Sequence, residues 1–414
     1  MPRTNLQTAI AKVASVVLLA LGLIVTHSAQ AQTFTHLHDF TNAADGGSPT
    51  AGVTLDGQGN IFGTASTGGD GNGGTVWQLK RSGQGWTLNT IHAFEPSNGD
   101  GKTPLGGVVI GPDGTLFGTT YSGGTGCYGM VCGTVYNLKP PQSFCHTGVC
   151  PWTETVLHNF AGYPYDGGEP QYMDPIFDAS GNMYGTTCGG GGVNYGTVFE
   201  MQPSNGSWTE SEIYVFDGGD GECPESGPIM DHAGNLYGTA IQGFGNQGEV
   251  WEISPDEPYW TQNVLVRFEE GENGNAPAAG LVADSAGNFY GMTLSGAVFE
   301  LSYSGGSWNY NQIYSLPGGG GYGAMTMDAA GNLYGVQYAG GMFDEGAVFE
   351  LVRNNGNWTY VSLHNFSLVN GGGWPYGGVT MDAAGNLYGT TSQGGFRASG
   401  CGYWGCGYVW EITP

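Results

Sequence analysis

One short phrase occurs seven times along the 414-residue chain, and this repetition constrains the fold more than any other feature. The phrase reads Asp-x-x-Gly-Asn, an apolar residue, an aromatic residue and Gly, with small departures between copies. Self-similarity at a period of this length is typical of proteins built from repeated supersecondary units. The copies span residues 56–63, 111–118, 178–185, 231–238, 284–291, 328–335 and 382–389.

Each copy lies among three other short segments that have the composition of β-strands. An apolar run precedes it, a Gly-x-Val-aromatic segment follows it, and a third segment begins at Trp, as at residues 86–94. These segments are rich in Val, Thr and aromatic residues and are bounded by Gly, Asn and Asp. We therefore predict four strands per unit, A to D, with Asp-x-x-Gly-Asn as the turn between strands A and B.

Four antiparallel strands in each of seven units predict an all-β fold, the seven-bladed β-propeller. The last unit ends at strand C, residues 408–412, and has no strand D of its own. The N-terminal segment Leu37-His38-Asp39-Phe40 matches strand D at residues 157–160 and 363–366. We predict that this segment completes blade 7, so that one closed ring spans residues 32–414 without a long unpaired edge.

The run Asp-Ala-Ala-Gly-Asn-Leu-Tyr-Gly-Thr-Thr at residues 382–391, with the Gly-Gly pair and the Gly-x-Val-Phe-Glu-Leu segment of the repeat, resembles the GloVer tandem repeat. This repeat is named for Gloeobacter and Verrucomicrobia, and the resemblance covers nearly all of residues 34–412. It implies an exported bacterial propeller-like protein, often held at the surface by a C-terminal anchor. Only Thr413 and Pro414 follow Ile412 in this sequence, so we expect this protein to depart from the family in its anchor. The family has no agreed catalytic residues, so none are transferred.

Residues 1–31 have the pattern of a secretory signal peptide. Arg3 and Lys12 precede an apolar run at residues 13–25, and Ala29-Gln30-Ala31 is a small-x-small cleavage site. The apolar run is too short to span a bilayer comfortably. We therefore expect a secreted or periplasmic monomer with no transmembrane segment after cleavage.

The charge balance excludes one large class of partner. The chain has 35 acidic and 9 Lys or Arg residues, which gives a formal net charge of −26. So few basic residues cannot neutralise a run of phosphates, and we expect no binding to nucleic acid.

Eight cysteines lie after the predicted signal peptide, and three pairs have the same spacing of four intervening residues. This spacing also resembles that of some zinc ligands, but an oxidising compartment and an even count favour disulfides. The short pairs are Cys127/Cys132, Cys145/Cys150 and Cys401/Cys406, and Cys188 and Cys223 remain.

Three sets of recurrent polar residues are interpreted as structural. The Asp of each A–B turn offers too few oxygens for a typical calcium site, so structural calcium is only the alternative to a turn carboxylate. The strand D histidines occupy equivalent positions on different blades, too far apart to share one zinc ion. The strand C glutamates are too dispersed for a glycosidase pair. We predict no metal site and no cofactor. The histidines are His38, His92, His158 and His364, and the glutamates are Glu200, Glu252, Glu300, Glu350 and Glu411.

The loops between strand D and the next strand A carry the best candidates for a ligand site. Four of them repeat Asp-Gly-x-x-Pro, beginning at Asp45, Asp100, Asp166 and Asp220. We expect these loops to converge at the channel mouth and to bring Asp100, Asp166 and Asp220 together with Asp174. The alternative is that the motif is only a turn between blades. Asp174 is notable because most other strands A have Gly at its position.

Aromatic residues in the same loops, and in the loop between Cys401 and Cys406, could stack on sugar rings while carboxylates accept hydroxyls. The candidates are Tyr163, Tyr165, Tyr322, Trp374, Tyr376, Tyr403 and Trp404.

Two functions are compatible with these candidates. The first is an exported non-catalytic module that binds a polysaccharide or a cell-surface component through the channel-mouth loops. The second is a carbohydrate-active hydrolase or lyase with Asp174, Asp166 and Asp220 as catalytic acids. No blade carries an obvious acid–base set, which favours the first.

Overall fold

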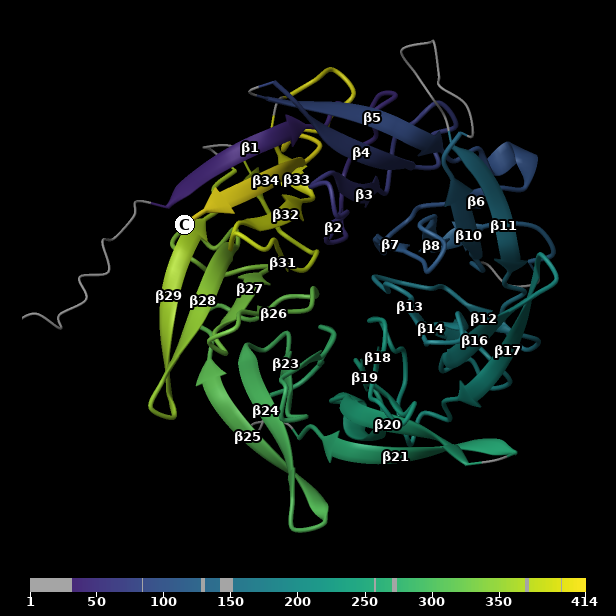
Figure 1. The fold of residues 1–414 in the computed structure, drawn as a ribbon, viewed down its shortest axis with the longest axis vertical. Coiled ribbons are helices and arrows are strands. Elements are labelled where there is room, and N and C mark those ends of the chain that lie inside the picture. The colour runs from purple at the N-terminus through teal and green to yellow at the C-terminus, as the bar shows by residue number, and fades with distance from the viewer. Residues whose placement is uncertain are drawn as a thin grey trace, which may run out of the picture.

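The computed structural model describes residues 32–83, 85–127, 131–141, 152–256, 258–269, 274–368, 372–395 and 397–414. The predicted signal peptide, residues 1–31, lies outside this part of the chain. The described chain forms seven four-stranded antiparallel sheets. They are arranged as blades around a central axis, with the first strand of each blade facing the axis and the last at the rim (Figure 1). The predicted all-β seven-bladed propeller is confirmed.

Each blade consists, from the axis outward, of an inner strand, two central strands and an outer strand. Blade 1 has β2 (Thr54–Leu55), β3 (Ile61–Ala65), β4 (Thr75–Ser82) and β5 (Gly85–Ala93). Blade 2 has β7 (Val108–Ile110), β8 (Leu116–Thr120), β10 (Thr134–Lys139) and β11 (Thr153–Asn159). Blade 3 has β13 (Ile176–Phe177), β14 (Met183–Thr187), β16 (Thr197–Ser204) and β17 (Ser207–Val215). Blade 4 has β18 (Ile229–Met230), β19 (Leu236–Ala240), β20 (Glu249–Asp256) and β21 (Tyr259–Arg267).

Blades 5 to 7 have the same arrangement. Blade 5 has β22 (Val282–Ala283), β23 (Phe289–Met292), β24 (Ala297–Ser304) and β25 (Ser307–Ser315). Blade 6 has β26 (Thr326–Met327), β27 (Leu333–Gln337), β28 (Ala347–Asn354) and β29 (Asn357–Asn365). Blade 7 has β31 (Thr380–Met381), β32 (Leu387–Thr391), β34 (Tyr408–Thr413) and β1 (Thr33–Asp39).

The remaining elements are short and lie in the loops. Three two-stranded ribbons pair β6 (Gly101–Lys102) with β9 (Ser122–Gly123), β12 (Gly167–Gly168) with β15 (Gly189–Gly190), and β30 (Gly372–Gly373) with β33 (Gln393–Gly394). Two 3-10 turns are η1 (Pro96–Asn98) and η2 (Phe244–Asn246). In the described residues no helix is long and apolar enough to cross a membrane.

The N-terminal strand closes the ring as predicted. β1 pairs antiparallel with β34, from Thr33 opposite Thr413 to Asp39 opposite Tyr408, and the two strands lie side by side in Figure 1. Phe40, which follows β1, is fully buried in the core between blades 7 and 1. The outer edge of blade 7 is thus covered by the opposite end of the chain.

The repeated phrase folds as a turn that saturates its own carboxylate. In blade 4, Asp231 Oδ1 accepts the N–H groups of Ala233 and Asn235 at 2.8 and 3.0 Å. Its Oδ2 accepts the Asn235 side-chain amide at 2.8 Å, and the Tyr237 hydroxyl lies 3.1 Å away. A short polar side chain that binds nearby backbone N–H groups stabilises such a turn. Turn geometry therefore accounts for both the Asp and the Asn of the phrase.

The Gly-x-Val and Asp-Gly-x-x-Pro motifs meet at every blade junction that carries both. At the first junction, a Cβ on Gly74 would lie 2.6 Å from Pro104 Cδ, and Gly74 has φ +98°. Thr103, just before the proline, has φ 59° and donates its N–H to the Gly73 carbonyl at 2.7 Å. Only Gly tolerates both the close approach and the positive φ. The loop motif therefore joins consecutive blades, as its structural interpretation requires.

Three of the predicted disulfides are present: Cys127–Cys132, Cys188–Cys223 and Cys401–Cys406. The second pairs the two cysteines that the spacing rule left over, and it links the loop after β14 to the loop before β18. No cysteine within the described residues is free. Cys145 and Cys150 lie outside the described residues.

Ring closure generates a stability prediction. Deleting residues 32–39 removes β1, exposes the edge of β34 and uncovers the apolar residues that Phe34 and Leu37 contact. Burial of an apolar side chain contributes roughly 1.5–3 kcal/mol, so we expect a loss of several kcal/mol in the free energy of unfolding. Calorimetry should show a lower melting temperature. The exposed Thr35→Ala should melt like the wild type, and an unchanged melting temperature in the deletion would contradict closure.

Candidate functional site

The short inner strands surround a cavity of about 360 Å³ on the propeller axis. Six of the seven blades contribute to its lining. Neighbouring chain segments approach one another closely around the axis. For example, a Cβ on Gly106 would lie 2.2 Å from the Met173 carbonyl oxygen, which leaves no room for a side chain. Close packing therefore requires small residues around the axis, and each larger residue there is an exception to the repeat.

Asp174 is the one charged side chain among the described residues that line this cavity. Its Oδ1 accepts the Gly107 N–H at 2.6 Å. The Asp174 side chain is exposed to channel solvent, but desolvation by the protein around the channel raises its pKa to about 6. The equivalent residues of the other blades are Gly52, Gly107, Gly227, Gly280, Ala324 and Gly378. Asp174 thus lies in the channel, and its role in binding or catalysis stays a prediction.

Four tyrosines cluster at the mouth of this cavity, and we call them the tyrosine rim: Tyr172, Tyr322, Tyr338 and Tyr376. The Tyr172 and Tyr376 rings stack with centroids 5.9 Å apart, and Tyr322 lies 5.1 Å from Tyr376. The Tyr376 hydroxyl donates to the Tyr338 hydroxyl at 3.2 Å. All four side chains are half-buried. Burial raises the pKa of Tyr172 to about 12, so its hydroxyl stays protonated near neutrality.

A second acid, Glu225, lies close enough to the tyrosine rim for its charge to act on two of the tyrosines. Burial raises the pKa of Glu225 to about 7, and one of its carboxylate oxygens is buried without a hydrogen-bond partner. Its charge also contributes to the raised pKa values of Tyr172 and Tyr322. The mouth therefore combines aromatic faces, hydroxyl groups and carboxylates.

The structure separates the predicted aromatic residues into two groups. Tyr322 and Tyr376 belong to the tyrosine rim, and Trp374 lies 6.3 Å from Tyr338. Tyr163 and Tyr165 are exposed in the loop between β11 and β12. Tyr403 and Trp404 are also exposed and contact each other within the Cys401–Cys406 loop. A role for any of these residues in ligand binding stays a prediction.

The expected meeting of the loop carboxylates at the channel mouth needs correction. Asp100 and Asp166 instead lie beside histidines of outer strands, with His92 Nε2 and His158 Nε2 at 3.2 and 2.7 Å. Asp220 forms a hydrogen bond with Tyr214, which is also on an outer strand. These acids lie in the first part of their loops and so remain near the outer edge of the propeller. Only the last part of each loop reaches the axis. Asp174 alone reaches the channel.

Sequence reasoning missed Tyr172, Tyr338 and Glu225. The sequence does contain a signal for Tyr172. Eight positions separate Pro170 from the turn residue Asp178 in blade 3, whereas seven separate the corresponding proline from the turn in five other blades. The extra residue lies in this segment, and Tyr172 has a φ of 42°. Tyr338 and Glu225 occupy positions that vary between blades, so the repeat gives no signal for them.

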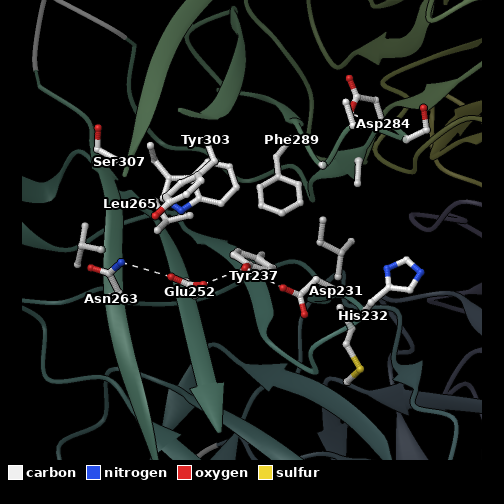
Figure 2. Close-up of a pocket in the computed structure, with 18 of the residues that line it drawn as sticks. Asp231, His232, Tyr237, Glu252, Asn263, Leu265, Asp284, Phe289, Tyr303 and Ser307 are labelled. Atoms are coloured by element: carbon white, nitrogen blue, oxygen red, sulfur yellow. Dashed lines mark hydrogen bonds between the residues drawn. The ribbon is translucent and has the colours of Figure 1, made fainter. Parts of the chain in front are cut away.

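A larger groove of about 960 Å³ lies between blades 4 and 5 (Figure 2). Its walls include Phe289 and Trp308, whose rings stack at 5.0 Å, and the exposed Tyr303, 5.4 Å from Trp308. On the opposite wall, Glu252 lies 2.8 Å from the Tyr237 hydroxyl and accepts the Asn263 amide at 3.3 Å. The groove thus also has an aromatic side and an acidic side.

Two other junctions carry an arginine that this junction lacks. At the register positions opposite Trp86 and Trp358 stand Arg81 and Arg353, which cover those rings and reach Glu411 and Glu300 of the preceding blades. Opposite Trp308 the residue is Tyr303, and the corresponding residues opposite Trp208 and Trp260 are Pro203 and Pro255. Tyr303 therefore offers no ion pair to Glu252 at this junction.

The blades, the axial cavity and the repeated turns define a seven-bladed β-propeller of the tandem-repeat type. The family model of the Gloeobacter/Verrucomicrobia repeat matches residues 19–149 and 131–311. These ranges cover more than half of the chain, and the protein belongs to this family. The resemblance drawn from the repeated phrase is confirmed. A comparison with curated proteins finds no match.

Several solved structures are similar to this chain at low identity. A protein from Bacteroides uniformis assigned as a 6-phosphogluconolactonase has 13% identity and a TM-score of 0.51, over 80% of this chain and 88% of its own. A gluconolactonase from Xanthomonas campestris has 14% identity and a TM-score of 0.41, over 76% and 90%. At these identities, the likeness to the Bacteroides protein concerns the fold alone.

The raised pKa of Asp174 generates a pH-dependent prediction. In the unfolded chain Asp174 ionises near 3.8, but in the channel near 6, so ionisation opposes folding as the pH rises through this window. We expect Asp174→Asn to gain stability over the wild type between pH 4 and 7, by roughly 1 kcal/mol because channel solvent screens the charge. Melting temperatures from pH 3 to 8 measure this difference. A difference that does not vary with pH would contradict it.

Proposed function

We propose that this protein is an exported, non-catalytic module that binds a glycan at the mouth of its central channel. The observation that carries the proposal is the tyrosine rim around a cavity with a single carboxylate, Asp174. Aromatic faces stack on the apolar faces of sugar rings, while hydroxyl and carboxylate groups hydrogen-bond to sugar hydroxyls. The rim offers both kinds of contact in one half-buried surface.

The charge of the site narrows the class of ligand. Asp174 lines the cavity, the charge of Glu225 acts on Tyr172, and the whole chain has a formal net charge of −26. Carboxylates near a binding surface disfavour anionic partners, because like charges repel. We therefore infer a neutral glycan or one with amino sugars, and we expect uronic-acid polymers and sulfated glycans to bind more weakly.

Export and a monomeric state are part of the same proposal. The signal-like residues 1–31 support export, and the three disulfides of the described residues agree with an oxidising compartment. A cell-surface component that displays such a glycan would be accessible to the protein there.

Substitutions in the tyrosine rim test this function. Each ring that stacks on a sugar should contribute about 1 kcal/mol or more, so Tyr322→Ala and Tyr376→Ala should each weaken binding about tenfold. A glycan array followed by calorimetric titration of the best ligand measures this loss. Tyr259→Ala is the matched control, because it removes an exposed tyrosine that lines neither the axial cavity nor the groove between blades 4 and 5. Tyr303→Ala tests the groove itself.

The Tyr303→Ala variant also discriminates between the tyrosine rim and the groove between blades 4 and 5. Binding that survives the rim variants but is lost in Tyr303→Ala would move the site to the groove between blades 4 and 5. The absence of any glycan ligand for the wild type would reject the proposed function.

A second candidate, carbohydrate-active catalysis, is favoured by one observation. The Asp174 pKa of about 6 is suitable for a general acid or base near neutrality. Glycosidases, however, need two carboxyl groups within roughly 5–10 Å, and the axial cavity offers one. The catalytic role predicted for Asp166 and Asp220 would require a separate site, because both acids bond to outer strands.

Asp174→Asn separates catalysis from binding. If the protein only binds, the wild type should bind a glycan without releasing any product, and Asp174→Asn should behave likewise. Chromatography of each bound glycan after prolonged incubation measures turnover. Product formation by the wild type that Asp174→Asn abolishes would instead establish the enzymatic function.

A further inference from the structure

Two clusters of metal-ligating side chains lie at consecutive blade junctions, away from the channel. The first contains His92 from β5, Asp100 from the following loop and Glu154 from β11 of the next blade. The second contains His158, Asp166 and Glu210 in equivalent positions, one blade further on. In each cluster one ligand atom from every residue lies within 4.8 Å of the other two.

The distances within the first cluster suit a shared ion. His92 Nε2 lies 3.2 Å from Asp100 Oδ2 and 3.9 Å from Glu154 Oε2. Ligands on a tetrahedral ion with bonds of about 2.1 Å are separated by about 3.4 Å, so only small adjustments are needed. Backbone N–H groups of Glu95 and Gly101 hold the Asp100 carboxylate in place. Such outer hydrogen bonds are typical supports of metal ligands.

The second glutamate oxygen in each cluster has no partner. Glu154 Oε1 and Glu210 Oε1 are both buried and form no hydrogen bond. A buried carboxylate oxygen without a partner has a substantial cost in free energy. At the first cluster there is also a cavity of about 460 Å³, and no Lys or Arg stands among the described residues that line it. The first cluster therefore has space for a cation, and the described residues that line its cavity supply no Lys or Arg side chain to fill it.

The excess of negative charge is the same at both junctions. Each cluster brings two carboxylates and one imidazole together within 4.8 Å. When both carboxylates are ionised, even a protonated histidine leaves one negative charge uncompensated. A divalent cation would compensate this charge.

The repeat itself provides five comparison junctions. The glutamates occupy the outer-strand positions opposite Leu138 and Met201. Glutamate thus occurs at two of the three junctions where the preceding blade offers both a His and an Asp in contact. At the blade 6–7 junction, Phe34 stacks on His364 instead, at 3.6 Å. The residues at the equivalent positions of the other blades are not metal ligands: Leu88, Gln262, Tyr310, Tyr360 and Phe34.

We propose that the His92–Asp100–Glu154 and His158–Asp166–Glu210 clusters are two sites for divalent transition-metal ions that join blade 1 to blade 2 and blade 2 to blade 3. One imidazole nitrogen with two carboxylate oxygens is a donor set for Zn²⁺ and similar ions, whereas Ca²⁺ and Mg²⁺ prefer oxygen alone. Each ion would link the outer strands of neighbouring blades and so stabilise the ring. Its remaining coordination positions would be filled by water.

Zinc titration of the metal-depleted, tag-free protein tests this assignment. Equilibrium dialysis against Zn²⁺ with elemental analysis should give two ions per chain. Glu154→Gln and Glu210→Gln should each reduce the number to one, and the double variant should bind none. Gln has the shape of Glu, and near-UV circular dichroism checks that each variant keeps the fold. A saturating Zn²⁺ concentration should also raise the melting temperature of the wild type but not that of the double variant.

A neighbouring junction supplies the matched control. His38 lies 3.2 Å from Asp45, but Leu88 stands at the glutamate position, so this junction lacks the third ligand. His38→Gln should therefore leave two ions bound. Failure of the wild type to bind Zn²⁺, or two ions still bound in the Glu154→Gln/Glu210→Gln variant, would overturn the proposal. If a glutamate variant fails to fold, His92→Gln and His158→Gln provide the same test.

Discussion

The pairing of β1 with β34 is the interaction on which the ring depends. Seven blades pack through buried aromatic and aliphatic side chains, and each blade needs a neighbour on both sides to cover its faces. In six blades the outer strand follows directly in sequence, but in blade 7 it comes from the other end of the chain. Without that strand, blade 7 would expose an unpaired edge, and Phe40 would lose its place in the core between blades 7 and 1.

The fold was predictable because each blade repeats the same local solution. Three features recur at equivalent positions of the sequence. They are the Asp-x-x-Gly-Asn turn, the loop proline that contacts the first glycine of strand C, and the residue pattern of the outer strand. The match of residues 37–40 to strand D also predicted closure. The Cys127–Cys132 and Cys401–Cys406 disulfides followed from their spacing, while the Cys188–Cys223 pair needed the arrangement of two loops that are distant in sequence.

The site was less predictable, because functional positions are departures from the repeat. Asp174 was recognisable as a carboxylate where other blades have Gly or Ala, and its place in the channel was correct. Asp100 and Asp166 were misplaced, because the motif does not show that their side chains turn back to a histidine of the preceding strand. The histidines were judged as metal ligands only in combination with one another. Several of them instead contact a carboxylate from the loop that follows them, and at two junctions a glutamate from the next blade joins the pair.

The register of β1 against β34 also sets the order in which the molecule can be completed. Thr33 is among the first described residues to be synthesised, and its partner Thr413 is among the last. Contacts between such distant residues form late, since the entropy of a long loop must be lost before they form. β1 therefore cannot complete blade 7 until β34 has been synthesised. The ring closes only when these two distant strands pair.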